Sequence, residues 1–336
     1  MIQTDNLSRS FRAPAGEEVF AVRSIDLHVA AGETVAVLGP NGAGKSTLMR
    51  MLSTLLPPTT GSAKVAGFDV AAQGSMVRER IGYVGQGNGA GHTQRAIDEV
   101  ITQGRIYGLS RAAARQRAGE LLATLALEHL AKRKTQAMSG GQRRRLDLAI
   151  GLVNKPPLLF LDEPTTGLDP QNRSNLWDHI LTVRQEADMT VLFSTHYLEE
   201  ADQAADRVIV IDNGRIIADG PPGALKQRHV GDRVILNAPD AEAAERLRPL
   251  LAQMHGVRNV TTDGCAVTAQ VDDGRGAIVA AISTARHHNI DILAADAQLP
   301  TLNDVFLKLT GRSLRDTGEG AAEPGQESNE PQEHKK

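Results

Sequence analysis

Cysteine and aromatic residues are scarce in this sequence, and each shortage excludes a class of protein. The 336 residues include a single cysteine, Cys265, so neither an internal disulfide framework nor a zinc site with several cysteine ligands is possible. Aromatic residues make up only 3% of the chain, whereas hydrophobic residues make up 41%. We therefore expect an aliphatic core, with Cys265 as a small buried member, and no aromatic surface on which single-stranded nucleic acid stacks.

Long apolar runs and an excess of charge are missing as well. No segment approaches the roughly 18 apolar residues of a transmembrane helix, and the N-terminus lacks the apolar stretch of a secretory signal. The net charge of −3 equals that of the tail Ser313–Lys336, which has three basic and six acidic residues, so the rest of the chain is neutral. A neutral body lacks the basic surface of a nucleic-acid-binding protein, and we expect a soluble cytosolic protein without a nucleic-acid partner.

The apolar periodicity predicts an α/β protein. Short continuous apolar runs at 34–38, 158–161, 191–193 and 208–211 alternate with segments of helical spacing. Strands that are apolar on both sides are typical of a parallel sheet that is covered on both faces.

A domain boundary is predicted at Pro221-Pro222-Gly223. Between Arg233 and Ala294 the order strand, helix, strand, strand, helix, strand matches a ferredoxin-like α+β unit. From Gly318 onward almost no apolar residue is present, so the tail should be disordered. We therefore divide the chain into a first domain at 1–228, an accessory C-terminal α+β domain at 229–312 and a disordered acidic tail at 313–336.

A phosphate-binding loop is predicted between the first buried strand and the helix that follows it. The residues from Gly39 to Ser46 fit the pattern GxxxxGK[ST], and the motif lies between a strand and a helix as this chemistry requires. Its glycines let successive backbone N–H groups point at phosphate oxygens, and the helix N-terminus adds partial positive charge. The residues expected to bind the nucleotide here are Gly39, Pro40, Asn41, Gly42, Ala43, Gly44, Lys45, Ser46 and Thr47.

A second motif supplies carboxylates. The apolar run Leu158–Leu161 ends in Asp162-Glu163, which would lie beside the phosphate loop at the carboxyl end of its strand. Asp162 can hold Mg²⁺ together with Ser46, and Glu163 can act as general base toward water. An isolated Asp-Glu pair would instead be a solvated turn, but its position after a buried strand in a chain with a phosphate loop favours the catalytic interpretation.

The four residues Ser139, Gly140, Gly141 and Gln142 resemble the signature of ATP-binding-cassette (ABC) ATPases. The same residues would also cap a helix with Ser139, which leaves N–H groups free for an anion. The resemblance covers about 2–227. It implies a P-loop NTPase fold with a RecA-like core, an antiparallel β subdomain and a helical subdomain. It also implies that two copies dimerise head to tail, with this signature facing the ATP bound by the other copy.

Further matches occur in the order that the family shows. Gln86 resembles the glutamine that reaches Mg²⁺ and the attacking water, and Asp169 in Gly167-Leu-Asp169 resembles the loop that crosses the dimer interface. His196 resembles the histidine that contacts the γ-phosphate. Phe11 occupies the position of an adenine-stacking aromatic, with Phe20 as the competing candidate and a role in the strand's core as the other alternative. The resemblance implies ATP and Mg²⁺ as ligands.

The C-terminal half resembles the bacterial drug-resistance exporters of the daunorubicin/doxorubicin type. The matching segments are Thr195–Asp202, Asp212–Arg215 and Thr301–Phe306. This resemblance implies an ATPase subunit that is held peripherally at the cytoplasmic side of the membrane by a separate transmembrane permease, which docks beside Gln86. Two other classes remain as alternatives: a soluble ABC ATPase that acts on ribosomes or DNA, and an inactive ATP-binding subunit.

Two clusters of polar residues are interpreted as ordinary surface. Arg143-Arg-Arg145 is expected to form a solvated helix face, with contact to phosphate or lipid as the alternative. His287-His288 is expected to lie at an exposed helix end, because no cysteine or acidic residue stands at metal-ligand spacing.

Overall fold

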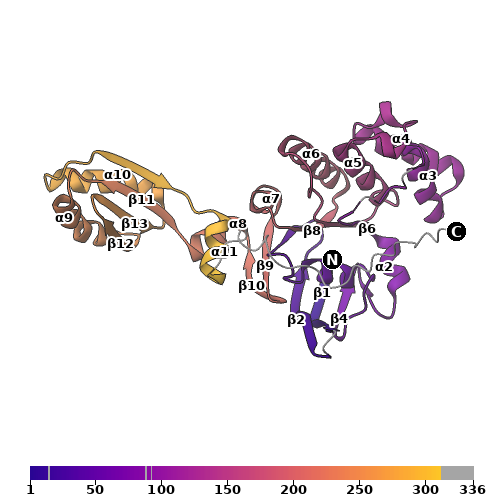
Figure 1. The fold of residues 1–336 in the computed structure, drawn as a ribbon, viewed down its shortest axis with the longest axis horizontal. Helices are drawn as coiled ribbons and strands as arrows, with labels where there is room; N and C mark the ends of the chain where they lie inside the picture. The colour runs from indigo at the N-terminus through magenta and orange to yellow at the C-terminus, as the bar shows by residue number, and fades with distance from the viewer. Residues whose placement is uncertain (14–15, 88, 92, 312–336) are drawn as a thin grey trace, which may run out of the picture.

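The computed structural model describes residues 1–13, 16–87, 89–91 and 93–311. The tail 313–336, for which disorder is expected, lies outside the described residues. Figure 1 shows a large N-terminal part built around two sheets and a smaller C-terminal part with a third sheet, joined at α8 and α11.

The central sheet has six strands in the order β10-β9-β3-β8-β7-β6. All neighbouring pairs are parallel except β9 and β10, which are antiparallel and joined by a tight turn at Asn213-Gly214. The strands are β3 (Thr34–Leu38), β6 (Ile81–Val84), β7 (Leu158–Asp162), β8 (Thr190–Thr195), β9 (Arg207–Asp212) and β10 (Arg215–Gly220). The predicted parallel sheet is therefore confirmed.

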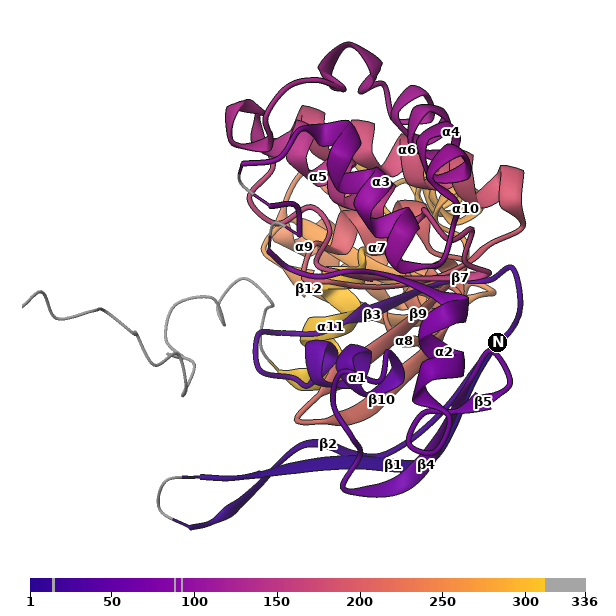
Figure 2. The ribbon, with the colours of Figure 1, turned by 90° about the vertical axis from the view of Figure 1, so that its right-hand side faces the viewer.

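An antiparallel sheet covers one face of the central sheet, with a helix between the two layers (Figure 2). Its order is β2-β1-β4-β5. The elements on this side are β1 (Ile2–Arg12), β2 (Glu18–Val29), β4 (Thr60–Val65), β5 (Phe68–Asp69), α1 (Lys45–Leu52) and α2 (Gly74–Arg80). Because side chains alternate along a strand, Val35 and Val37 of β3 face this layer while Ala36 and Leu38 face the opposite one.

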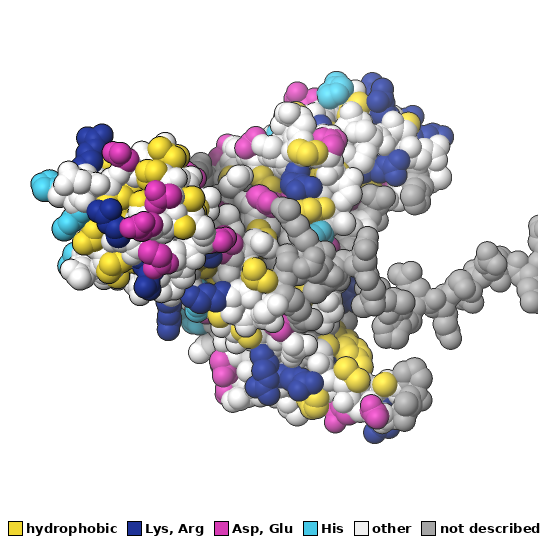
Figure 3. Space-filling model, turned by 60° about the vertical axis from the view of Figure 1, so that its left-hand side comes forward, with side chains coloured by type: hydrophobic (Ala, Val, Ile, Leu, Met, Phe, Trp, Pro, Cys, Tyr) yellow, Lys and Arg dark blue, Asp and Glu magenta, His cyan; other side chains and the backbone are white. Residues whose placement is uncertain are grey.

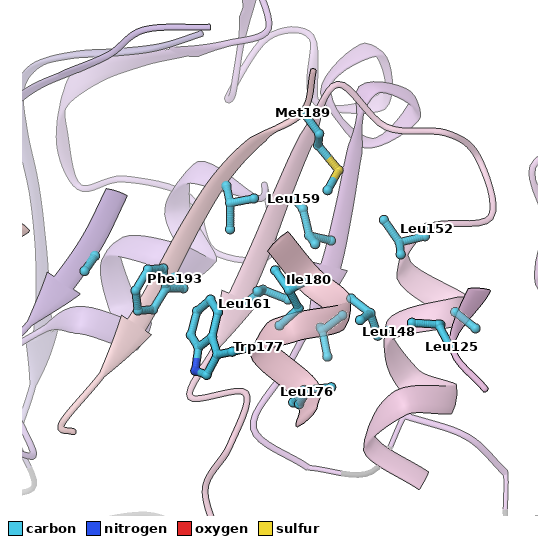
Figure 4. Packing of buried hydrophobic residues seen from close by; sticks show 14 of the residues in the cluster. Leu125, Leu148, Leu152, Leu159, Leu161, Leu176, Trp177, Ile180, Met189 and Phe193 are labelled. Atoms are coloured by element: carbon cyan, nitrogen blue, oxygen red, sulfur yellow. The ribbon is translucent and has the colours of Figure 1, made fainter. Parts of the chain in front are cut away.

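Helices cover the other face. They are α3 (Ala96–Ile106), α4 (Arg111–Thr124), α5 (Gly140–Gly151), α6 (Pro170–Ala187) and α7 (Leu198–Ala204), with short 3₁₀ turns at Glu128–Leu130 and Thr135–Ala137. Trp177 of α6 packs edge-on against Phe193 of β8, with 4.5 Å between ring centroids, and aliphatic side chains such as Leu161 and Ile180 surround the pair (Figure 4). The expected aliphatic core with few aromatics is thus present.

The C-terminal part has its own core. Its elements are α8 (Pro222–His229), β11 (Asp232–Asn237), α9 (Ala241–Ala252), β12 (Val257–Asp263), β13 (Ala266–Val271), α10 (Gly274–His287), β14 (Ala294–Gln298) and α11 (Leu302–Thr310). The sheet is antiparallel in the order β12-β13-β11-β14, and α9 and α10 supply the rest of its apolar cluster. Its surface mixes apolar, acidic and basic side chains on the face that Figure 3 shows.

Helix α11 belongs to a different core from the sheet that precedes it. Leu302, Val305 and Phe306 are buried in the same cluster as Ala201 of α7 and Leu225 of α8. The chain thus leaves the large part at α8, forms the third sheet and returns to pack on the large part.

The cysteine and the histidine pair of the C-terminal part are all exposed. Cys265 is exposed at the turn between β12 and β13, so the prediction of a buried cysteine is wrong. The tight turn leaves no layer above this side chain. His287 and His288 are exposed at the end of α10, as expected.

Candidate active site

The phosphate loop connects the carboxyl end of β3 to the N-terminus of α1. Gly42 and Gly44 have φ values of 78° and 106°, which favour glycine. A Cβ atom at Gly44 would lie 2.2 Å from the carbonyl oxygen of Ala21, and one at Gly39 would lie 2.3 Å from that of Ile211. Glycine is therefore required here both by backbone conformation and by close packing.

Lys45 begins α1 and is folded back over its own loop. Its Nζ donates hydrogen bonds to the carbonyl oxygens of Gly39 at 2.9 Å and Pro40 at 3.0 Å, and lies 3.7 Å from Oε1 of Glu163. Burial lowers the pKa of Lys45, whereas the carboxylates of Glu163 and Asp162 act in the opposite direction. The ammonium group is held beside the carboxyl ends of β3 and β7.

Asp162 lies at the end of β7 and receives three side-chain hydrogen bonds. Ser46 Oγ donates to its Oδ1 at 3.0 Å and Ser194 Oγ donates to the same atom at 2.6 Å, while the hydroxyl of Tyr83 donates to Oδ2 at 3.4 Å. Gln86 Nε2 in turn donates to Ser46 Oγ at 3.1 Å. Ser46, Gln86 and Asp162, which are distant in sequence, therefore form one oxygen-rich cluster.

Glu163 occupies a left-handed conformation, with φ of 47°. Its Oε2 lies 3.4 Å from Nδ1 of His196 and accepts a hydrogen bond from Thr166 Oγ1 at 3.1 Å. Burial raises the pKa of this carboxyl, but the contacts with His196 and Lys45 outweigh burial and leave the pKa below its ordinary value. The structure thus brings together Lys45 at the start of α1, Glu163 after β7 and His196 after β8.

Ser139 and Gln142 form a capping box at the start of α5. Ser139 Oγ accepts from the backbone N–H of Gln142 at 3.3 Å, and Gln142 Oε1 accepts from that of Ser139 at 3.0 Å. Asp169 caps α6 by accepting from the N–H of Asn172 at 2.9 Å. A Cβ atom at Gly141 would lie 2.6 Å from Oδ1 of Asn172, so the two helix starts are neighbours.

The starts of α5 and α6 are exposed, and they are separate from the group that Lys45, Glu163 and His196 form. Ser139, Gly140 and Asp169 are exposed, and in the described residues no hydrogen bond or ion pair joins them to Lys45 or Glu163. The predicted site therefore divides into two groups within one chain.

The two candidate stacking aromatics lie on the antiparallel sheet. Phe11 of β1 is 43% exposed and Phe20 of β2 is 37% exposed, and the guanidinium of Arg9 lies 4.9 Å from the Phe11 ring. The alternative that Phe11 is a core aromatic is wrong, because the strand hairpin extends beyond the layers that would cover it.

Known proteins resemble this chain over most of its length. The family profile described as ABC transporter matches residues 22–166. The daunorubicin/doxorubicin resistance ATP-binding protein DrrA of Streptomyces peucetius is 43% identical over 306 residues, covering 90% of this chain and 92% of that protein. The linearmycin resistance ATP-binding protein LnrL of Bacillus subtilis is 34% identical, covering 94% of this chain and 100% of that protein.

The protein belongs to the ABC transporter family. It is an ATP-binding subunit with the ATPase fold of that family, of the drug-resistance type. Among solved structures, the ATP-binding cassette MJ0796, a dimer in a post-hydrolysis state bound to ADP and Pi, matches with a TM-score of 0.61. The identity is 26%, over 66% of this chain and 98% of that chain.

Sequence reasoning missed part of this ABC ATPase's site. Arg144 was expected on a solvated face of the signature helix α5, but it is 7% exposed, and the expectation is wrong for this residue. Helical periodicity could have indicated this, because Gly141, Arg144 and Leu148 share one face of α5 and all three are buried. Tyr83, which contacts Asp162, was also missed; burial and Asp162 raise its pKa to about 12.

Glu200 of α7 is a further missed residue, buried between the segments that carry Glu163 and His196. Thr195 Oγ1 donates to Glu200 Oε2 at 2.9 Å, and Thr165 Oγ1 donates to Oε1. Arg173 lies 3.6 Å from this carboxylate, and its guanidinium also stacks on Tyr197. The carboxylate thereby ties the residue before His196 to the loop after β7.

The Glu200→Gln variant of this ABC ATPase is expected to gain stability relative to wild type as pH rises. Burial raises the pKa of Glu200 above the ordinary 4.5, against hydrogen bonds from Thr165 and Thr195. A raised carboxyl pKa in the folded state means that stability is complete below pH 4.5 and is lost as pH increases through the folded-state pKa. Glutamine does not ionise, so the variant does not lose this stability as pH rises.

The measurement is the Tm of both proteins between pH 4.5 and 7.5. We expect the Tm of the variant minus that of wild type to increase by about 2–4 °C, the shift that about 1 kcal/mol produces in a domain of this size. Glu199→Gln, at the exposed neighbouring position, is the matched control, and its Tm difference from wild type is measured over the same pH range. A constant difference for Glu200→Gln would show that Glu200 is not a strained buried carboxylate.

Proposed function

We propose that this ABC ATPase is the ATP-hydrolysing subunit of an exporter and acts with a separate transmembrane permease at the cytoplasmic side of the membrane. The main support is that five side chains predicted to bind or hydrolyse ATP converge at the carboxyl ends of parallel strands. They are Lys45, Ser46, Asp162, Glu163 and His196. The names of similar proteins add support, since they include resistance to daunorubicin and linearmycin and, at 35% identity, Nod factor export. In the described residues, no helix is long and apolar enough to cross a membrane.

The nucleotide phosphates would lie in the phosphate loop. The backbone N–H groups of 39–47 and the N-terminus of α1 supply donors, and Lys45 exchanges its contacts with Gly39 and Pro40 for the β- and γ-phosphates. The adenine would stack on Phe11, which is exposed beside the loop's sheet layer, with Phe20 on the adjacent strand as the alternative.

Mg²⁺ would be held by Ser46, Gln86 and Asp162. Their cluster offers a hydroxyl, a carboxylate and, after rotation of its amide, the carbonyl oxygen of Gln86, which are the hard oxygen ligands that Mg²⁺ prefers. The ion would neutralise charge on the phosphate oxygens. The remaining acceptor capacity of Asp162 is fixed by Ser194 and Tyr83, which orient its carboxylate.

Glu163 would act as general base and His196 as the partner that orients it and contacts the γ-phosphate. The lowered pKa of Glu163 keeps the carboxylate ionised near neutral pH, so it can accept a proton from the attacking water. Gln86 would help to place this water, since it already lies beside Ser46.

Two copies of the chain would form the working unit, head to tail. Ser139, Gly140, Gly141 and Gln142 of one copy would cover the ATP on the phosphate loop of the other, and Asp169 would lie in the same interface. The exposed start of α5 supports this, because the positive end of its helix dipole suits an anion that the same chain does not bring to it. The dimeric cassette MJ0796 adds further support.

We propose that the chain is organised as a nucleotide-binding domain at 1–228, an accessory domain at 229–312 and an acidic tail at 313–336. The strand order β12-β13-β11-β14 with all pairs antiparallel supports a ferredoxin-like accessory domain. In that fold each strand–helix–strand unit has one strand of the other unit between its two strands, as β13 lies between β11 and β12 here. The return of α11 to α7 and α8 holds this domain at both ends.

The test is affinity capture of tagged Glu163→Gln protein from detergent-solubilised membranes of the native host, with ATP, followed by mass spectrometry. We expect one multi-span membrane protein to co-purify, and to be absent when tagged Lys45→Ala is used. Recovery only with ribosomal or DNA-repair proteins would contradict the exporter proposal and favour the non-transport ABC class.

A further inference from the structure

We propose that Arg144 and Asp147, two residues of α5, are positioning residues that couple the Gln86 loop to the catalytic loop. The Gln86 loop is residues 85–87 and 89–91, and the catalytic loop is residues 162–166. The inference rests on the proposed function and concerns how the state of the ATP site reaches the loop beside which the permease would dock.

The guanidinium of Arg144 is shared between the two loops. Toward the Gln86 loop, its Nη1 donates to the carbonyl oxygens of Gly85 at 2.7 Å and Gly87 at 3.2 Å. Toward the catalytic loop, Nε donates to Pro164 at 2.5 Å, and Nη2 donates to the carbonyl oxygens of Asp162 and Glu163, each at 3.4 Å. No other described residue donates side-chain hydrogen bonds to the backbone carbonyls of both loops.

Asp147, one turn further along α5, holds the other half of the Gln86 loop. Its Oδ1 accepts from the backbone N–H of Gly89 and of Ala90, each at 3.0 Å. Its Oδ2 lies 3.9 Å from Nη1 of Arg144. Arg144 therefore donates hydrogen bonds to carbonyl groups of the loop, and Asp147 accepts hydrogen bonds from its N–H groups. The loop's backbone is thus bound by two opposite charges on one face of α5.

Arg144 and Asp147 are both buried, so water cannot readily replace the contacts that either side chain makes. Arg144 is 7% exposed and Asp147 is 4% exposed. Truncation of one partner would leave the other as a buried charge without its counter-ion, so separating the two side chains from each other or from the loops is costly. The loop's glycines fit this arrangement: a Cβ atom at Gly89 would lie only 3.3 Å from Oδ1 of Asp147.

The position of the pair on α5 gives it a function. This helix begins at the Ser139–Gln142 motif, which would contact ATP on the other copy of the chain. Any displacement of the Gln86 loop must therefore break the Arg144 fork, move α5 with its motif, or shift the carbonyl groups beside Glu163. Arg144 thus links movement at the permease side to the general base and to the dimer-forming motif, without touching ATP itself.

Hydrogen exchange of the full-length chain, read by mass spectrometry with and without ATP, tests this inference. The background is Glu163→Gln, so that ATP persists. Protection of the phosphate loop by ATP reports binding, and the ATP-induced change at the Gln86 loop reports coupling. Arg144→Lys keeps the charge but loses the planar fork that bonds both loops. Arg145→Lys is the matched control, because among the described residues the guanidinium of Arg145 donates a hydrogen bond only to the carbonyl oxygen of Leu125.

We expect Arg144→Lys to bind ATP, with the phosphate loop protected, while the change at the Gln86 loop is lost; Arg145→Lys should keep both. Retention of the change in Arg144→Lys would overturn the inference. Asp147→Asn provides a second test without ATP, since loss of its charge should speed exchange at the Gln86 loop about tenfold and leave β7 peptides unchanged. Equal exchange in this variant and wild type would also overturn it. Lack of phosphate-loop protection in the parent protein would instead refute the proposed function.

Discussion

Replacement of Glu163 by glutamine is expected to reduce ATP turnover by about 10²- to 10⁴-fold, the usual contribution of a general base, while ATP still binds. The carboxylate is placed by contacts with Lys45 at 3.7 Å and His196 at 3.4 Å, and its backbone is fixed by the hydrogen bond from its N–H to Ser194 Oγ. Glutamine is nearly isosteric with glutamate, so the fold and the ATP contacts should persist. The amide cannot accept the proton from water, and the ATP-bound state therefore accumulates.

Steady-state phosphate release measures the loss of turnover, and gel filtration with ATP measures the accumulated state. Glu163→Gln should elute as a dimer with ATP and as a monomer without it, whereas wild type should show little dimer because hydrolysis separates the copies. Glu186→Gln, at an exposed position of α6, is the matched control and should behave as wild type. Monomers of Glu163→Gln at saturating ATP would contradict the head-to-tail mechanism.

Replacement of Lys45 by alanine should remove ATP binding at working concentrations and lower turnover by about 10²- to 10³-fold. Lys45 is 4% exposed, and its Nζ is the cation of the phosphate loop, where two carbonyl oxygens now hold it. Without it, the negative charge of the β- and γ-phosphates would lie beside Asp162 and Glu163 with one cation fewer.

Titration with a fluorescent ATP analogue measures binding, and the Tm without nucleotide checks that the fold is intact. Lys64→Ala, which removes an exposed lysine of β4, should bind as wild type does. ATP should raise the Tm of wild type and of Lys64→Ala but not that of Lys45→Ala. Near-normal ATPase activity of Lys45→Ala would refute the assignment of the phosphate loop.

The phosphate loop and the catalytic strand end were predictable because each is a local pattern with its own physical signature. Gly42 and Gly44 take positive φ values in a turn between strand and helix, and Asp162-Glu163 ends a continuous apolar strand. In a parallel sheet, such strand ends meet at one edge, so the proximity of Lys45 and Glu163 follows from the pattern. The histidine and glutamine depended on resemblance to a family, since a single His or Gln carries little local signal.

Arg144 and Glu200 were not predictable in this way, because their roles depend on contacts with segments far away in the chain. Three consecutive arginines read as a solvated surface, and only the packing of α5 against the ends of β6 and β7 buries the middle one. Glu200 likewise follows exposed Glu199, and its burial depends on Thr165 and Thr195 from other segments. Cys265 shows the opposite error, since an apolar residue at a turn has no layer to cover it.

The sequence by itself therefore determined the α/β class and the phosphate-loop and strand-end motifs, and its resemblance to known proteins indicated the family. The class and these motifs depend on backbone conformation and on periodicity, which neighbouring residues set. Only the tertiary structure decided which charged side chains are buried, how α5 joins the Gln86 loop to the catalytic loop, and that α11 returns to pack against α7 and α8. Burial and long-range hydrogen bonds are properties of the packed layers, and residues that are adjacent in sequence can face opposite environments.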